Sequence, residues 1–267
     1  MSSGKKPDRK RKTMLHIFAD ASAMKEDGTL RITGGDLNHM KNVCRLVPGD
    51  EVIVGTGGDD REYRYGIERY GQDERGADFA ELRLRFVKDA NVELPVRVVL
   101  YQGLPKADKM DLIVRKCVEL GVCEIVPTVM ERSIVRLDEQ KAARKVQRWQ
   151  AIAESAAGQS RRRILPQVHL PMPMQEAIAD AATRCSVLLL PYELQPADKG
   201  TREVLSGIRP GDRVAVFIGP EGGFTPEEVQ AARQSGAAPI SLGRRILRTE
   251  TAGMTFLSFL IYQFEIS

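Results

Sequence analysis

The sequence predicts an α/β protein in which a mostly parallel sheet follows a small N-terminal β domain. Beyond Pro95, short apolar runs that indicate buried strands alternate with stretches of helical periodicity, as in a parallel sheet with crossover helices. Before Lys88 the pattern consists instead of short β-forming runs between turn signals. A chain of 267 residues is long enough for two such domains, each with its own core.

The N-terminal third divides into a basic arm and a small β domain. Residues 1–13 carry no apolar pattern and several lysines and arginines, and we expect a disordered basic arm there. Turn signals and segments of alternating polarity follow at Pro48–Asp50, Gly57–Asp60, Arg61–Glu68 and Phe79–Val87. We therefore expect a small β-barrel or sandwich at residues 14–88, a linker at residues 89–95 and the α/β domain at residues 96–267.

The C-terminal domain is predicted to alternate strands with helices. Gly121 and Gly158 are expected to end helices, and Pro127 and Pro191 to follow the ends of strands. The expected strands are Val96–Tyr101, Cys123–Val126, Ser186–Leu190, Val214–Ile218 and Pro239–Leu242. The expected helices are Lys109–Leu120, Glu139–Ala157, Met174–Ala182, Pro226–Ser235 and Glu250–Phe264.

The run Val214–Ile218 and the residues after it are typical of a strand, a tight loop and a helix. The run is short, continuous and rich in β-branched residues, and the glycine-rich segment Gly219–Gly223 follows it directly. Thr225 can then cap a helix that begins at Pro226, and Glu228 completes a capping box. The glycine-rich segment therefore lies at the carboxyl end of a strand, where open α/β sheets bind ligands.

A second candidate ligand loop is Leu242–Thr251, between the last expected strand and the last expected helix. The formal net charge is +4 and the pI is near 8.9. Basic side chains gather in this loop and in several other places: Arg244, Arg245 and Arg248, Lys5–Lys12, Arg144 with Lys145 and Arg148, and Arg161–Arg163. Several separate clusters in one chain favour a polyanionic partner such as RNA over a merely solvated surface.

Several common ligand and catalytic motifs are absent from the sequence. Gly219–Gly223 does not have the G-x-G-x-x-G spacing of dinucleotide loops, and neither G-x-x-x-x-G-K-[ST] nor G-x-S-x-G occurs. The residues by themselves indicate a nucleotide-like ligand in backbone-lined loops, beside basic side chains suited to RNA.

The cysteines and histidines predict neither a metal site nor a disulfide framework. The four cysteines include no C-x-x-C pair, and the three histidines lie far apart in sequence. No apolar run approaches the ~18 residues of a membrane span. We therefore expect a cytoplasmic protein with buried inert thiols, no metal and no membrane partner.

Short motifs along nearly the whole chain occur together and in a fixed order. They are His39–Arg45 with Pro48–Asp50, Lys106 with Lys109–Ile113, Lys116, Glu119–Val122, Pro127, Glu131–Ser133, Glu154–Ala156 with Gln159–Ser160, Gly219–Gly223, and Leu242-Gly243 with Ile246–Ala252. In this combination they resemble the SPOUT methyltransferases, and within them the family that methylates N3 of a uridine in bacterial 16S ribosomal RNA.

The resemblance implies a PUA-like N-terminal β-barrel that helps to hold RNA, an α/β domain with a deep trefoil knot, and a homodimer. It also implies that S-adenosylmethionine lies across the loops after three strands, Ser186–Leu190, Val214–Ile218 and Pro239–Leu242. Backbone groups would hold the adenine and ribose, since glycines allow close approach. The implied cofactor-binding residues are Leu189, Leu190, Pro191, Ile218, Gly219, Pro220, Glu221, Gly222, Gly223, Leu242, Gly243, Ile246, Leu247 and Thr249.

Methylation of uridine N3 requires loss of the imide proton, and the uracil carbonyls gain negative charge as it leaves. A base or a cationic neighbour therefore helps the reaction. Arg248 is our first choice to stabilise the uracil anion or to grip its phosphate, and Glu221 and Glu250 are the candidate bases. Glu250 could equally serve as a first-turn acid of the last helix, and Thr249 as its N-cap.

The expected RNA contacts are basic side chains: Lys106, Arg132, Arg161, Arg162, Arg163 and Arg245. The expected partner is 16S ribosomal RNA within the small ribosomal subunit. A non-catalytic RNA-binding assembly factor is the main alternative, but it would require degraded ligand loops, and both loops are intact. A dinucleotide-dependent enzyme would require a fingerprint that the chain does not have. We therefore predict an S-adenosylmethionine-dependent ribosomal RNA methyltransferase.

Overall fold

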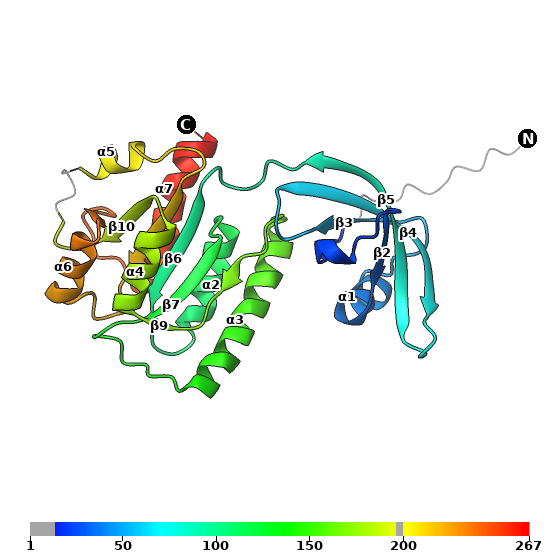
Figure 1. Ribbon diagram of the computed structural model, residues 1–267, viewed down its shortest axis with the longest axis horizontal. Coiled ribbons are helices and arrows are strands. Elements are labelled where there is room, and N and C mark those ends of the chain that lie inside the picture. Colours follow the sequence, from blue (N-terminus) through cyan, green and yellow to red (C-terminus); the bar gives the residue numbers. More distant parts are fainter. Residues whose placement is uncertain (1–13, 196–199, 267) are drawn as a thin grey trace, which may run out of the picture. The chain divides into compact units, whose positions relative to one another are not determined.

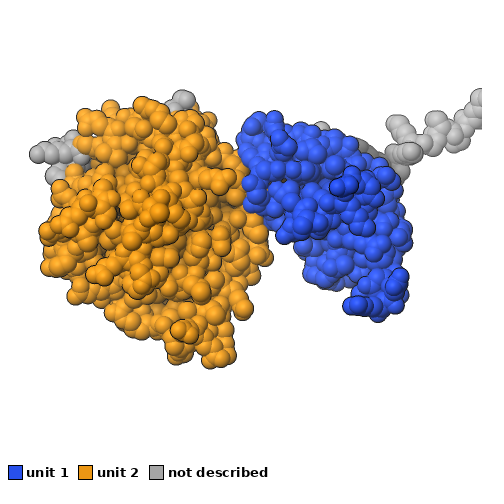
Figure 2. All heavy atoms as spheres, in the orientation of Figure 1, with its two compact units in different colours: residues 1–91 blue, residues 92–267 orange. Residues whose placement is uncertain are grey.

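The computed structural model describes residues 14–195 and 200–266. The chain divides into two compact units between Asn91 and Val92, which Figure 2 colours separately. This division falls inside residues 89–95, the segment expected to be a linker. The basic arm expected at residues 1–13 lies outside the described residues. No helix in the described part of the chain is long and apolar enough to cross a membrane.

The N-terminal unit is built on a five-stranded sheet with the order β1-β3-β4-β5-β2. Its strands are β1 (His16–Phe18), β2 (Thr29–Ile32), β3 (Glu51–Gly55), β4 (Arg61–Gln72) and β5 (Asp78–Asp89). Short helical segments come between the strands in the chain: η1 (Ala21–Ala23) between β1 and β2, and α1 (Gly34–Asn38) with η2 (His39–Val43) between β2 and β3. The pair β1–β3 is parallel and the remaining pairs are antiparallel. The core of this unit includes Leu30, Met40, Val52, Tyr65 and Leu82.

Strands β4 and β5 are longer than the sequence predicts, and their pairing contains two register shifts. The shifts lie between Arg64 and Tyr65 and between Ile67 and Arg69. Ala80 and Leu82 of β5 belong to the core of the unit, whereas the ring of Phe79 packs against the guanidinium groups of Arg31 and Arg69. The apolar residues of β5 therefore lie on both faces of the sheet.

The C-terminal unit contains a seven-stranded sheet, ordered β12-β10-β11-β6-β7-β8, with β9 also paired to β7. The strands are β6 (Arg97–Gly103), β7 (Glu124–Val129), β8 (Gln167–Val168), β9 (Met172–Pro173), β10 (Val187–Pro191), β11 (Arg213–Ile218) and β12 (Ala238–Ile240). Every pair in this sheet is parallel. The prediction of an α/β domain with a mostly parallel sheet is confirmed.

Helices cover both faces of this sheet (Figure 1). They are α2 (Lys109–Glu119), α3 (Glu139–Gln159), α4 (Met174–Arg184), α5 (Thr201–Ser206), α6 (Pro226–Gln234) and α7 (Thr249–Ile261), which continues into η3 (Tyr262–Ile266). On one face, Val99 and Tyr101 of β6 share a core cluster with apolar residues of α4 and α6. Neighbouring strand residues point to opposite faces, so Leu100 faces the other layer. There Gly253 of α7 lies close to Leu100 of β6 and to Cys117 of α2.

The expected helix start at Thr225 is confirmed, because Thr225 and Glu228 form a complete capping box before Pro226. Pro127 and Gly158, by contrast, do not end their elements. Strand β7 continues through Pro127, which lies between the residues paired with β8 and those paired with β9. Pairing with β8 or β9 therefore does not need the backbone N–H that proline lacks. Helix α3 continues past Gly158 to Gln159.

Candidate active site

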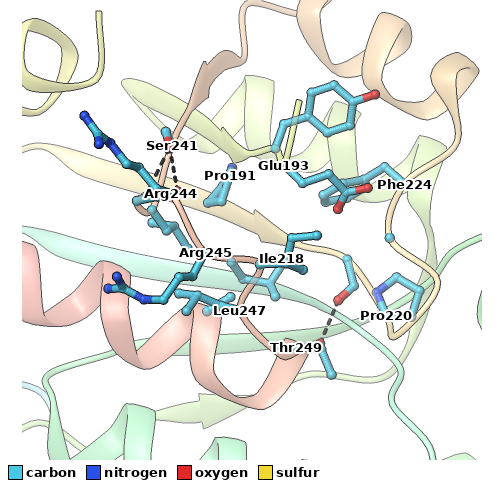
Figure 3. Close-up of a pocket in the computed structure, with 17 residues that line it drawn as sticks. Pro191, Glu193, Ile218, Pro220, Phe224, Ser241, Arg244, Arg245, Leu247 and Thr249 are labelled. Carbon is cyan, nitrogen blue, oxygen red and sulfur yellow. Dashed lines mark hydrogen bonds between the residues drawn. The ribbon is translucent and has the colours of Figure 1, made fainter. Parts of the chain in front are cut away.

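Loops after three neighbouring parallel strands meet at one edge of the C-terminal sheet. Strands β12, β10 and β11 are adjacent, so their carboxyl ends lie side by side. The loops line a hollow that opens to solvent (Figure 3). The lining residues are Pro191, Tyr192, Glu193, Ile218, Gly219, Pro220, Gly223, Phe224, Ser241, Leu242, Gly243, Arg244, Arg245, Ile246, Leu247, Thr249 and Ala252.

Glycine backbone forms the wall of the pocket next to β11. A Cβ atom on Gly219 would lie 3.2 Å from the main chain of Gly223, and one on Gly103 would lie 2.6 Å from the nitrogen of Pro220. Gly223 and Gly243 have φ angles of +67° and +116°, which side chains rarely allow. The wall therefore presents main-chain groups at close range beside apolar side chains. These surfaces fit the base and ribose of a nucleoside-like cofactor.

Thr249 connects the last helix to the loop after β11. Its hydroxyl donates to the carbonyl of Gly219 at 2.6 Å (Figure 3). The same hydroxyl accepts from the amide of Gln102 at 2.8 Å. Both Thr249 and Gln102 are buried. The N-cap of α7 is Arg248, so the interpretation of Thr249 as an N-cap is wrong. The Thr249 side chain instead points inward and bonds to Gln102 of β6 and to the loop after β11.

Lys109, the first residue of α2, bridges the two candidate bases. Its Nζ atom lies 2.9 Å from Oε1 of Glu221 and 3.5 Å from Oε2 of Glu250. The backbone N–H of Lys106 also donates to Oε1 of Glu221. Burial would raise the pKa of Glu221, but the hydrogen bonds from Lys109 and from backbone amides outweigh it, and the pKa is lowered. Glu221 is therefore an ionised carboxylate, and its Oε1 atom already accepts from two neighbouring donors.

Arg248 and Glu250 lie at the start of α7, directly after the pocket-lining loop. The Arg248 side chain is 81% exposed, and its Nη1 atom is 3.9 Å from Oε1 of Glu250. The Glu250 side chain is only 15% exposed, and its buried Oε2 atom accepts no hydrogen bond within the described residues. Arg248 is thus free to meet a substrate, whereas Glu250 is largely enclosed between Arg248 and Lys109.

Most of the expected cofactor-binding residues line the pocket: Pro191, Ile218, Gly219, Pro220, Gly223, Leu242, Gly243, Ile246, Leu247 and Thr249. Leu189 and Leu190 do not, because they are fully buried within β10. Glu221 faces Lys109, and Gly222 packs against Arg132. Lining residues that the sequence reasoning missed are Tyr192, Glu193, Phe224, Ser241, Arg244 and Ala252, all within a few residues of the expected loops.

The basic triplet Arg161–Arg163 does not form one RNA-binding surface, which corrects the expectation for Arg162 and Arg163. Both are only 3% exposed. The Nη2 atom of Arg162 lies 2.6 Å from Oε2 of Glu93, and its Nη1 atom donates to the carbonyls of Val118 and Val122. Arg162 is therefore half of a buried ion pair. Arg161 is exposed, as are the other expected RNA contacts, Lys106, Arg132 and Arg245.

The thiols and possible metal ligands in the described residues are dispersed. No three His, Cys, Asp or Glu side chains there are grouped as metal ligands. The four cysteines are free, and burial raises the pKa of Cys117 to about 12. A thiol with so high a pKa is a poor nucleophile.

Comparison with protein families places this arrangement among the RNA methyltransferases. Residues 92–261 match the model of the RNA methyltransferase domain, and residues 32–70 match that of the RNA methyltransferase PUA domain. The first match covers the whole pocket and the second lies in the five-stranded unit. The class of protein that fold and site define is therefore an RNA methyltransferase with an N-terminal PUA domain.

Individual relatives narrow this class. The ribosomal RNA small subunit methyltransferase E of Bacillus subtilis is 33% identical over 246 residues, covering 91% of this chain and 93% of the relative. The enzyme of the same name from Mycobacterium bovis is 30% identical, covering 91% and 90%. The crystal structure of the Neisseria gonorrhoeae enzyme bound to S-adenosyl methionine has a TM-score of 0.76 and 29% identity, covering 94% and 98%. This chain belongs to the ribosomal RNA small subunit methyltransferase E family.

Proposed function

We propose that the protein transfers the methyl group of S-adenosylmethionine to N3 of one uridine in 16S ribosomal RNA, in the cytoplasm and within the small ribosomal subunit. The single observation that carries the proposal is the pocket lined by the loops after β10, β11 and β12, with the exposed Arg248 directly beside it. Relatives named for methylation of small-subunit ribosomal RNA support the substrate. A methyltransferase structure with bound S-adenosylmethionine supports the cofactor.

Main-chain groups of Gly219, Leu242, Gly243 and Leu247 would hold the adenine and ribose, between Pro191 and Ile218. The bound cofactor supplies an electrophilic methyl group on its sulfonium. The protein supplies position, which accounts for a large part of the acceleration of such an in-line displacement. On the glycine-lined wall, the ligand would contact backbone atoms rather than mobile side chains.

Arg248 stabilises the negative charge that uracil gains as N3 loses its proton. Of the two candidate bases we favour Glu250, because its contact with Nζ of Lys109 is the longer one, 3.5 Å against 2.9 Å for Glu221. Glu221 is engaged by Lys109 and Lys106 and has a lowered pKa, so it is the weaker base. Exposed Arg132, Arg161, Arg245 and Lys106 would contact RNA phosphates.

The trefoil knot and the homodimer belong to the same proposal. Helix α7 follows the edge strand β12 in the chain but packs on α2 and β11. The hydrogen bonds of Thr249 to Gly219 and Gln102 join the start of α7 to the loop after β11 and to β6, which supports a chain threaded through that loop. Apolar side chains left exposed next to α7, Tyr262 at 65% and Ile266 at 70%, suit a subunit contact. Light scattering on the purified protein tests the dimer.

The reaction is tested with tritiated S-adenosylmethionine and small ribosomal subunits from a strain that lacks its own enzyme. Label mapped by nuclease digestion and mass spectrometry to N3 of one uridine is the expected result. Arg248→Ala should abolish it while cofactor affinity is kept, and Arg233→Ala, an exposed arginine on α6, serves as the matched control. Cofactor binding without label on any RNA would overturn the proposed substrate and favour a non-catalytic RNA-binding role.

A further inference from the structure

Glu193 places a free carboxylate on the wall of the cofactor pocket. It follows β10 by two residues, is exposed to solvent and lines the hollow. Its carboxylate lies beside the loop after β11, where a Cβ atom on Gly223 would be 3.4 Å from Oε2 of Glu193 (Figure 3). Within residues 14–195 and 200–266, Glu193 makes no hydrogen bond or ion pair, so its carboxylate is available to a ligand.

Charge is distributed unevenly around this pocket. Among the described residues that line it, Glu193 is the single carboxylate, while Arg244 and Arg245 lie on the loop after β12. In Figure 3 the guanidinium groups of these two arginines extend away from Glu193. The carboxylates of Glu221 and Glu250 are paired with Lys109 instead. The Glu193 side of the pocket is therefore negative, with no paired cation among the described residues.

A negative wall suits the charge of the proposed cofactor. S-adenosylmethionine is positive at its sulfonium and at its α-ammonium group, whereas its adenine and ribose are neutral. The apolar and main-chain surfaces of Pro191, Ile218 and Leu247 suit the neutral nucleoside. Glu193 lies apart from them, beside Phe224 (Figure 3).

We propose that Glu193 is a specificity-determining residue that binds the positively charged methionyl portion of S-adenosylmethionine, an inference that rests on the proposed function. The carboxylate attracts the sulfonium, the α-ammonium or both, and so favours this cofactor over neutral adenine nucleosides of the same shape. Because the group is exposed, its attraction is screened by salt, and the gain in affinity is modest.

Isothermal titration calorimetry on the full chain tests this proposal with the wild type, Glu193→Gln and Glu227→Gln. Glu227 is a matched control, because it is an exposed glutamate on α6 that does not line the pocket. Glu193→Gln should weaken S-adenosylmethionine binding about fivefold at low salt, and less as sodium chloride is added. Glu227→Gln should bind like the wild type. Methylthioadenosine, which has neither positive group, should bind all three proteins equally.

S-adenosylhomocysteine, which keeps the ammonium but has no sulfonium, identifies the charge that Glu193 contacts. If Glu193→Gln loses as much affinity for S-adenosylhomocysteine as for S-adenosylmethionine, contact with the ammonium is supported. If it loses no affinity for S-adenosylhomocysteine, contact with the sulfonium is supported. Unchanged S-adenosylmethionine binding by Glu193→Gln would overturn the inference and leave the proposed function intact. An equal loss for methylthioadenosine would also overturn it, since Glu193 would then contact the ribose or base. A wild type that binds no S-adenosylmethionine would overturn the proposed function itself.

Discussion

Replacing Thr249 by valine tests how the last helix is held against the pocket. The change removes a hydroxyl and keeps the side-chain shape. The carbonyl of Gly219 loses its donor at 2.6 Å, whereas the amide nitrogen of Gln102 keeps a second acceptor, the carbonyl of Gly103 at 3.0 Å. One unsatisfied, partly buried carbonyl is therefore the main cost, about 1–2 kcal/mol. We expect the free energy of unfolding to fall by that amount.

Equilibrium urea unfolding measures this loss through the fluorescence of Trp149, the single tryptophan, which is buried on α3. Thr251→Val is the control, because Thr251 is an exposed threonine on the same helix. Calorimetry adds a second readout. Gly219 lines the pocket, so Thr249→Val should also weaken S-adenosylmethionine binding, while Thr249→Ser should retain it.

Two results would refute this reasoning. The first is a Thr249→Val protein whose stability lies within the ~0.5 kcal/mol expected for a surface substitution. The second is an equal loss in Thr249→Val and Thr251→Val. Either result would mean that the hydrogen bonds of Thr249 do not hold α7 in place.

Three further predictions follow from buried or paired charges. Glu93→Gln leaves the guanidinium of Arg162 buried without its carboxylate, and urea unfolding should show a loss of about 3–5 kcal/mol, absent in exposed Glu176→Gln. A hydrogen bond with His169, opposed by burial and supported by Arg184, lowers the pKa of Glu124 to about 2. Its contribution is therefore complete above pH ~4.5 and is lost as the pH falls towards ~2, so Glu124→Gln should flatten the acid limb of the stability curve. Lys109→Met should raise the dissociation constant for S-adenosylmethionine about threefold, and Lys109→Arg should restore it, as calorimetry can measure.

Local signals were sufficient to predict the parallel sheet and most of the pocket. Thr225, Pro226 and Glu228 predict the start of α6, because a capping box depends only on residues within one helical turn. The apolar run Val214–Ile218 predicts β11 for a similar reason, because a buried strand needs apolar side chains on both faces. The glycine-rich loop then follows at the carboxyl end of the strand, where the structure has the pocket.

Features that depend on distant partners could not be predicted in this way. Arg162 looks like a solvated cation in the sequence, and its partner Glu93 is 69 residues away. Lys109 and Glu221 are 112 residues apart in the sequence, so neither residue predicts the hydrogen bond between them. Glu193 has no motif of its own. The only signal for it was its place three residues after the expected strand Ser186–Leu190, in the first of the ligand loops.

The late position of Thr249 in the chain determines when the pocket can form during synthesis. Translation produces β10 and β11 well before the loop after β12 and helix α7. A nascent chain that has not reached β12 carries two of the three pocket loops, and one that has not reached Thr249 has no hydroxyl to hold Gly219. N-terminal segments fold first as a chain leaves the ribosome, so cofactor binding is acquired only after β12 and α7 have been made. A fragment released early in translation would have no complete site with which to sequester the cofactor.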